Sequence, residues 1–415
     1  MGRARKHGGL TGMARRTSGP TQTKIADPAF VWKHKGDGKS SDGMVARLSC
    51  ESRQGAGVMP QLWYKCATSQ TDCILAVMAT DSHDLSTESE LLTSLPDIAV
   101  SVQGFGSQDT AQALGNGVIH LLHEVGRFID ISSLDGVTIA VDYDAALRDL
   151  DRGIEGLRPE ERTKDGILTG VGKAILVKRA DDVKTHLVFA AEALSCLALK
   201  EADSGLFYLA LALIAHECAH VEEHARRNRQ FPGTLLNEES LGFVPACLRQ
   251  FSEAFWCEYA VCRASANFAP NEGDGFREAL KLRLEPARRE AREAIKAYRT
   301  HGDALRVFNE VGLAVIEPLR MASYLFGHLD GFSGDLTDVT IELPTNDQAF
   351  VAGITELVSQ LRDLWDRRDH WESHDDMLVL GETAFDVLRL CGVDVQPSAN
   401  GQAHIAVPIT LDTIP

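Results

Sequence analysis

The stretch that decides the fold is residues 204–230, which read SGLFYLALALIAHECAHVEEHARRNRQ. Apolar residues recur at helical spacing along its first half, Asp203 is a residue type that begins helices, and a Pro-Gly pair follows as a stop signal. The sequence therefore predicts one long helix over residues 204–229. That helix carries the pentapeptide HECAH at residues 216–220, which has the pattern H-E-x-x-H.

The H-E-x-x-H pattern places His216 and His220 on one face of the predicted helix. Four residues advance a helix by about 400° and about 6 Å, so both imidazoles project to the same side and can bind one zinc ion. Glu217 lies beside them, where its carboxylate can take a proton from an attacking water molecule. The pattern thus indicates a hydrolytic metal site. The competing interpretation is a pair of structural histidines that form ion pairs with nearby glutamates, and it predicts no third ligand.

A zinc hydrolase needs a third protein ligand and one coordination position left open for water. The segment 248–268 has the pattern of a helix and offers two carboxylates, Glu253 and Glu258. Glu258 lies on an apolar stripe and is the ligand that we expect, because a buried carboxylate needs a positive partner. Glu253 faces polar neighbours and is an alternative. His224 is another alternative, although a straight helix carries it about 6 Å beyond His220.

The H-E-x-x-H helix, followed by Trp-x-Glu-Tyr at residues 256–259, resembles the gluzincin type of zincin metallopeptidases. The resemblance covers residues 137–269. It implies a Zn2+ ion held by two histidines and a glutamate: His216, His220 and Glu258. It also implies that Glu217 is the general base of peptide-bond hydrolysis. Cys262 departs from the family, since many gluzincins have an aspartate there that supports a ligand histidine, and no subfamily matches closely enough to transfer a substrate.

Two further residues near the motif are candidates for a supporting role. Tyr259 and His224 are possible groups for orienting a ligand or stabilising an oxyanion, but we expect Tyr259 to be a packing residue and His224 to be a surface histidine at the helix end. Every motif residue that catalysis requires is present, which favours an enzyme. The alternative is a catalytically silent zincin-like protein that works as a binding or sensor protein.

The sequence before the motif fits an α+β fold, with a mixed β-sheet in a zincin-like core, an active-site helix that carries the motif, and a mainly helical C-terminal part. Apolar periodicity and turn residues predict these elements: helix 109–128, strand 136–142, helix 145–151, and strands 172–177 and 183–190. We expect strand 183–190 to be the sheet edge that holds an extended substrate by backbone pairing.

Composition along the chain suggests four regions. They are a disordered basic tail at 1–27, a small β-rich N-terminal region at 28–105, the zincin-like core at 106–270, and a mainly helical C-terminal region at 271–415. The tail has almost no large apolar residues, so it lacks the groups needed to pack on a core. In the last region the patterns predict helices 276–300, 304–329 and 348–365 and strands 339–343 and 405–409.

The overall composition is that of a globular protein with an acidic balance. The net charge of the 415 residues is −17, which argues against general nucleic-acid binding because phosphate binding needs concentrated positive charge. The longest apolar run, 206–215, is too short to span a bilayer. The nine cysteines form no C-x-x-C pair and are typical of reduced thiols. We therefore expect a soluble cytoplasmic protein that acts on a peptide or protein substrate, without nucleic-acid or membrane partners.

Overall fold

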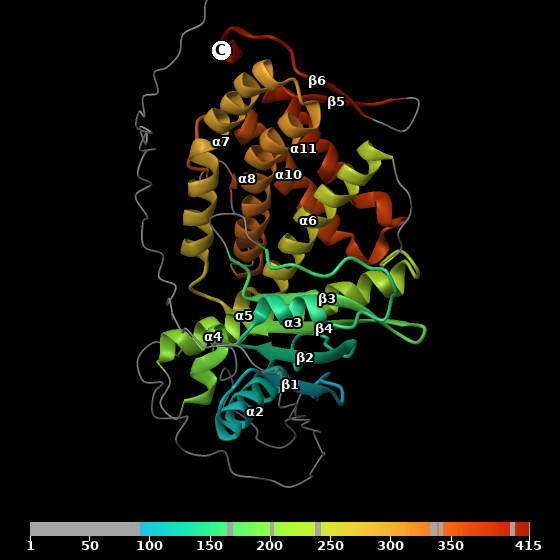
Figure 1. Ribbon diagram of the computed structural model, residues 1–415, viewed down its shortest axis with the longest axis vertical. Helices are drawn as coiled ribbons and strands as arrows, with labels where there is room; N and C mark the ends of the chain where they lie inside the picture. Colours follow the sequence, from blue (N-terminus) through green and yellow to red (C-terminus); the bar gives the residue numbers. More distant parts are fainter. Residues whose placement is uncertain are drawn as a thin grey trace, which may run out of the picture. The chain divides into compact units, whose positions relative to one another are not determined.

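A four-stranded mixed sheet and a group of long helices make up the part of the chain that the structure describes (Figure 1). The computed structural model describes the following residues: 92–163, 169–199, 203–236, 242–332, 338–339, 343–398 and 403–414. All of them belong to one unit, Gly43–Pro415. The predicted tail 1–27 and residues 28–91 of the predicted β-rich region lie outside the described residues.

The sheet is mixed, as predicted. Its strands are β1 (Ala99–Gln103), β2 (Leu134–Ala140), β3 (Gly172–Arg179) and β4 (Asp182–Ala190). Their order is β1-β2-β4-β3. β1 pairs with β2 and β2 with β4 in parallel, whereas β3 and β4 form an antiparallel hairpin. The α+β class, the mixed sheet and the three predicted strands are therefore confirmed.

The edge strand of this hairpin is β3, so the prediction that residues 183–190 form the edge is wrong. β4 lies between β2 and β3 and is paired on both sides. Its last four residues, 187–190, are all apolar and buried. A continuous apolar run of this kind is typical of a strand covered on both faces. β3 instead alternates in burial along its second half and pairs on one side only among the described strands.

Helices cover both faces of the sheet. α2 (Gln108–Val125) and the motif helix α5 (Ser204–Gln230) pack on one face, where Phe189 of β4 joins residues of both helices in one apolar cluster. α3 (Tyr143–Asp149) packs on the other face against Val188. β1 falls in the interval predicted as a separate N-terminal region, but it pairs with β2 and belongs to this sheet.

The motif helix α5 forms as the sequence predicts. The Asp203 carboxylate accepts hydrogen bonds from the backbone N–H groups of Gly205 and Leu206, which caps the start of the helix. The helix ends at Gln230, and Gly233, with φ of 81°, turns the chain just beyond it. Its length and apolar composition also fit a membrane span, a test that buried core helices pass equally.

The chain after α5 is mainly helical. Its longer helices are α6 (Phe243–Ser265), α7 (Gly273–His301), α8 (Ala304–Phe332), α10 (Gln348–Asp366) and α11 (Leu378–Leu390). All but α11 were predicted from the sequence. Their buried faces form a second apolar core that includes Trp256 and Tyr259 of α6. Val261 of α6 belongs instead to the core beside the sheet, so α6 joins the two layers.

Two short strands, β5 (Asp394–Pro397) and β6 (Ala403–Ala406), pair near the end of the described chain. β6 overlaps the strand predicted at 405–409 but ends before Pro408, which lacks the backbone N–H that further pairing needs. Most of the strand predicted at 339–343 lies outside the described residues, and Val339 is helical.

α8 approaches α6 closely at Gly327 and Gly331, which are four residues apart. A Cβ atom at Gly327 would collide with the backbone oxygen of Tyr259, and one at Gly331 would collide with that of Arg263. No larger side chain fits at either position unless one of the two backbones moves. This contact holds α8 against the same helix that carries Glu258.

Gly327→Ala is expected to destabilise the protein, because its methyl group overlaps the α6 backbone. Overfilling a packed interior typically costs about 1–3 kcal/mol. Gly312→Ala is the matched control on the same helix, because a Cβ atom there meets nothing within 4 Å in the described chain beyond its chain neighbours and the nearby backbone of its own helix. The control should leave the free energy of unfolding unchanged or raise it by up to about 1 kcal/mol. Urea unfolding measures both variants, and equal midpoints would contradict the close contact between α8 and α6.

Candidate metal centre

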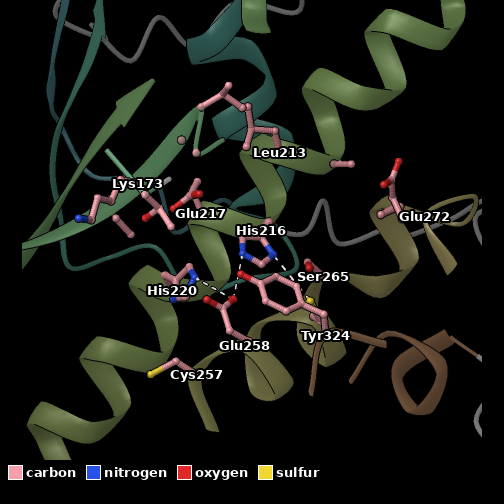
Figure 2. A pocket seen from close by; sticks show the side chains of 18 of the residues that line it. Lys173, Leu213, His216, Glu217, His220, Cys257, Glu258, Ser265, Glu272 and Tyr324 are labelled. Atoms are coloured by element: carbon pink, nitrogen blue, oxygen red, sulfur yellow. Dashed lines mark hydrogen bonds and ion pairs between the residues drawn. The ribbon is translucent and has the colours of Figure 1, made fainter. Parts of the chain in front are cut away.

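α5 and α6 bring the three predicted metal ligands together (Figure 2). His216 and His220 project from one face of α5, and Glu258 reaches them from α6. Glu258 Oε2 lies 3.6 Å from His216 Nε2 and 3.9 Å from His220 Nε2. One potential ligand atom of each side chain lies within 4.8 Å of those of the other two. Within the described ranges, no other group of histidine, cysteine or carboxylate side chains meets this criterion.

The spacing of these side chains fits a shared cation better than direct hydrogen bonds. Separations of 3.6 and 3.9 Å are longer than an N–H···O hydrogen bond. Two ligands that bind one tetrahedral zinc ion at about 2.1 Å lie about 3.4 Å from each other. Glu258 Oε2 is buried and has no hydrogen-bond partner among the described residues, a costly state for a carboxylate oxygen. The donor set and this buried atom therefore fit a zinc ion.

Burial keeps both histidines neutral. It lowers the pKa of His216 to about 4 and the pKa of His220 well below its ordinary value. Neutral imidazole is the form that binds a metal ion. Burial also raises the pKa of Glu258, although the charge of Arg320 and a hydrogen bond with Tyr324 act in the opposite direction. A cation bound between the three groups would stabilise the charged form of this carboxyl group.

Glu217 lies in the same cavity as the three ligands but does not belong to their cluster. It is 6% exposed, and its carboxylate lies against β3, where a Cβ atom at Gly172 would come within 2.9 Å of its Oε1. Burial and the neighbouring carboxylate of Glu258 raise the pKa of Glu217 to about 8. A carboxyl group whose pKa lies near neutrality can both take up and release a proton.

The centre opens into a cavity of about 490 Å3. This volume lies in the range of small-molecule sites, about 300–1,000 Å3. The cavity walls come from β3, α5, α6, α7 and α8, so the sheet layer and the helical layer both contribute. Gly172 and Ala174 of β3 line it beside Glu217, while Phe276 comes from α7 and Tyr324 from α8.

One face of α8 lines the cavity with residues that the sequence does not single out. They are Arg320, Tyr324 and His328. Their spacing of four puts them on one helical face, in the same way as the two histidines of the motif. The Tyr324 ring is parallel to that of His216, with centroids 6.0 Å apart, and Tyr324 lies close enough to Glu258 to lower the pKa of that carboxyl group. The spacing Arg-x3-Tyr-x3-His is a signal in the sequence, but it becomes informative only once α8 is known to face the cavity.

Two of the other sequence candidates lie outside the cluster. Glu253 has a side chain that is 39% exposed, and its Oε1 lies 3.9 Å from Arg227 Nη1 and 3.8 Å from His374 Nε2. Tyr259 is fully buried, and its hydroxyl group donates a hydrogen bond of 2.8 Å to Asp330. The prediction that Tyr259 is a packing residue is therefore confirmed.

His224 and Cys262 lie beside the centre. His224 is partly buried, lines the cavity and shares a hydrogen bond of 3.0 Å between its Nδ1 and Thr185 Oγ1. The prediction of a surface histidine is wrong, because the sheet covers this part of α5. Cys262 Sγ lies 3.9 Å from His216 Nδ1, at the position where the resemblance leads us to expect an aspartate. Burial raises the pKa of this thiol, so it stays neutral and is a weak partner for the histidine.

No protein-family model, curated protein or solved structure matches the chain. The geometry of the site is therefore the basis of the functional argument. It combines a helix of the H-E-x-x-H pattern, a buried carboxylate from the next helix, and an edge strand beside the motif glutamate.

Glu258→Ala is expected to weaken zinc binding by at least about 100-fold, because it removes one of three protein ligands and the negative charge among them. Competition against a coloured zinc chelator measures the affinity. Glu253→Ala is the matched control on the same helix and should keep the parental affinity. A loss of affinity in the Glu253 variant alone would reverse the assignment. If both variants keep the parental affinity, the third ligand is His224 or a cysteine instead.

Proposed function

We propose that this chain is a zinc-dependent peptidase with a zincin-like core. The observation that carries the proposal is the buried Oε2 atom of Glu258, which lacks a hydrogen-bond partner in the described part of the chain and faces the two imidazoles of the motif at 3.6 and 3.9 Å. Glu217 lines the same cavity outside this cluster. The combination supports a hydrolytic centre, because it supplies a cation site and a separate base.

Each of the four residues has its own role in this proposal. His216, His220 and Glu258 hold the ion, and bound zinc polarises the scissile carbonyl group and makes an attacking water molecule more acidic. Glu217 accepts a proton from that water molecule while the water oxygen adds to the carbonyl carbon. The carbon–nitrogen bond then breaks, and Glu217 passes the proton to the leaving nitrogen.

Two residues of α8, Tyr324 and Arg320, lie beside the proposed ligand Glu258. The hydroxyl group of Tyr324 lies where it can orient the Glu258 carboxylate, whose charged form it favours. Arg320 lies near the same carboxylate, and its Nη2 donates a hydrogen bond of 2.6 Å to Glu317. Groups that orient a metal ligand in this way commonly change metal affinity or activity when they are removed.

β3 supplies the backbone that would hold a peptide substrate. Gly172 and Ala174 of this edge strand line the cavity beside Glu217. Extended peptides commonly bind by adding a strand to an exposed sheet edge. This supports a peptide as the substrate and moves the predicted binding edge from β4 to β3.

Glu217→Gln is expected to keep zinc and the fold but to lower peptide hydrolysis by about 100-fold to 10,000-fold, because glutamine has the same shape and cannot accept the proton. Metal analysis and the cleavage of casein measure the two properties. Glu253→Gln is the control and should cleave at the parental rate. Full activity in the Glu217 variant would refute its role as the base. A zinc-loaded parent that cleaves nothing would favour a silent binding or sensor protein instead.

Gly172→Ala is expected to lower hydrolysis without weakening zinc binding. The added methyl group would lie 2.9 Å from both Glu217 Oε1 and Leu213 Cδ1, so the Glu217 carboxylate must shift while the ligands stay in place. A small displacement of a catalytic group costs about 10-fold to 100-fold in rate. Gly170→Ala is the control, because its Cβ atom would have Thr163 Cβ as its nearest neighbour at an ordinary 3.4 Å. Equal rates in the two variants would show that Glu217 is not confined by β3.

A further inference from the structure

Glu272 lines the cavity but has no part in the proposed mechanism. It directly precedes α7, and its side chain is partly buried. In the view of Figure 2, Glu272 and Lys173 lie on opposite sides of His216. The cavity therefore continues past the candidate metal centre, away from β3, to a wall that carries a carboxylate.

The carboxylate of Glu272 makes no hydrogen bond or ion pair with another described residue. It does not cap α7, because it accepts no hydrogen bond from the first N–H groups of that helix. Arg277, on the next turn of α7, pairs with Asp274 at 3.0 Å instead. Burial raises the pKa of Glu272, and no group of the described chain acts on it in the opposite direction. A partly buried carboxylate of this kind lacks a cation.

The other charged side chains among the described wall residues already have partners or roles. Lys173 Nζ lies 2.6 Å from Glu160 Oε2, and Arg320 Nη2 lies 2.6 Å from Glu317 Oε2. The two remaining carboxylates of the wall are the proposed base and the proposed metal ligand. Glu272 is therefore the charged group that is left to bind a group from outside the chain.

A row of aromatic rings leads from the candidate metal centre to this end of the cavity. The ring centroid of Tyr324 lies 6.0 Å from that of His216 and 5.7 Å from that of Phe276. Phe276 in turn lies 5.5 Å from His328, which is neutral because burial and a neighbouring arginine lower its pKa. Phe276 follows Glu272 by four residues, so the two lie on the same side of α7. The row offers an uncharged surface that ends beside a carboxylate.

Glu272 is also close to the candidate metal centre. Its negative charge, together with that of Glu258, raises the pKa of the Cys262 thiol. The Sγ atom of Cys262 lies 3.9 Å from His216 Nδ1. A long side chain of a substrate residue bound near the metal can therefore extend to Glu272.

The side chains of lysine and arginine match this combination. Their methylene groups pack along apolar surfaces while the charged end binds a carboxylate, and the attraction is stronger in a partly buried site than in water. We propose that Glu272 is a specificity-determining residue, which binds the lysine or arginine side chain of a peptide substrate whose methylene groups lie along the aromatic row. The net charge of −17 also favours the approach of cationic substrates. This inference rests on the proposed function and names its substrate class.

The first test uses the zinc-loaded full chain and short peptides that are blocked at both ends. The peptides differ at one position, which is lysine or its neutral acetylated form, and this position is moved along the peptide. At the best position, kcat/KM for lysine should be at least about tenfold higher, because one charge-assisted hydrogen bond is gained.

Three results of this test would count against the proposals. Equal rates for lysine and acetyl-lysine at every position overturn the inference but leave a peptidase. A gain that requires a free amino terminus and no lysine also overturns it, because the bound cation is then the amino terminus. Absence of any cleavage overturns the proposed function and this inference with it.

The second test changes the carboxylate. Glu272→Gln keeps the shape without the charge and should reduce the ratio of the lysine rate to the acetyl-lysine rate to near one. Glu278→Gln is the matched control on α7, since its side chain is 61% exposed and pairs with Lys281, and it should keep the parental ratio. Glu272→Lys should make a glutamate peptide better than the lysine peptide, a reversal that a purely structural role would not produce. A parental ratio in the Glu272→Gln variant overturns the inference.

The third test measures recognition without hydrolysis and decides the matter if the Glu272 variants fail to fold. Calorimetry with the zinc-loaded Glu217→Gln variant compares the affinities of the lysine peptide and its acetylated form. The lysine peptide should bind at least about tenfold more tightly, and the difference should shrink as salt is added because Glu272 is only partly buried. Equal affinities at low salt overturn the inference.

Discussion

The buried carboxylate of Glu258 is the constraint on which the site depends. An uncompensated charge in a protein interior costs several kcal/mol, and its Oε2 atom finds no hydrogen-bond donor in the part of the chain that the structure describes. Arg320 and Tyr324 compensate for it from α8. The two motif imidazoles on its other side are neutral and contribute lone pairs rather than charge. A cation between the three side chains would satisfy all of them at once, which supports the proposed metal centre over a structural ion pair.

The centre exists because two layers with separate cores meet along α6. Val261 belongs to the core beside the sheet, whereas Tyr259 belongs to the core of the helical layer. Glu258 lies between them in sequence and points into the space between the layers (Figure 2). Glycines let α8 lie against the α6 backbone, so the distance between the cavity walls is set by backbone contact. The three candidate ligands therefore lie on helices of two layers that pack directly against each other.

β3 has different neighbours along its length, and this difference shapes the proposed chemistry. At Gly172 and Ala174 its outer edge faces the cavity and the motif glutamate. At Leu176 and Lys178 the same edge is bonded to Arg152, and just before β3 the N–H of Gly170 donates to the oxygen of Thr163.

The sequence by itself determined the helix of residues 204–230, the shared face of His216 and His220, and the choice of Glu258 over Glu253. These features depend on periodicity within one helix, which local sequence encodes. Only the tertiary structure decided that β3 is the edge strand, that His224 is covered, and that Tyr324 reaches the site from α8. Strand order depends on pairing between distant segments, and the exposure of a helical residue depends on what packs against it. A spacing such as Arg-x3-Tyr-x3-His marks a helical face, but only the close approach of α8 to α6 turns that face toward the candidate metal centre.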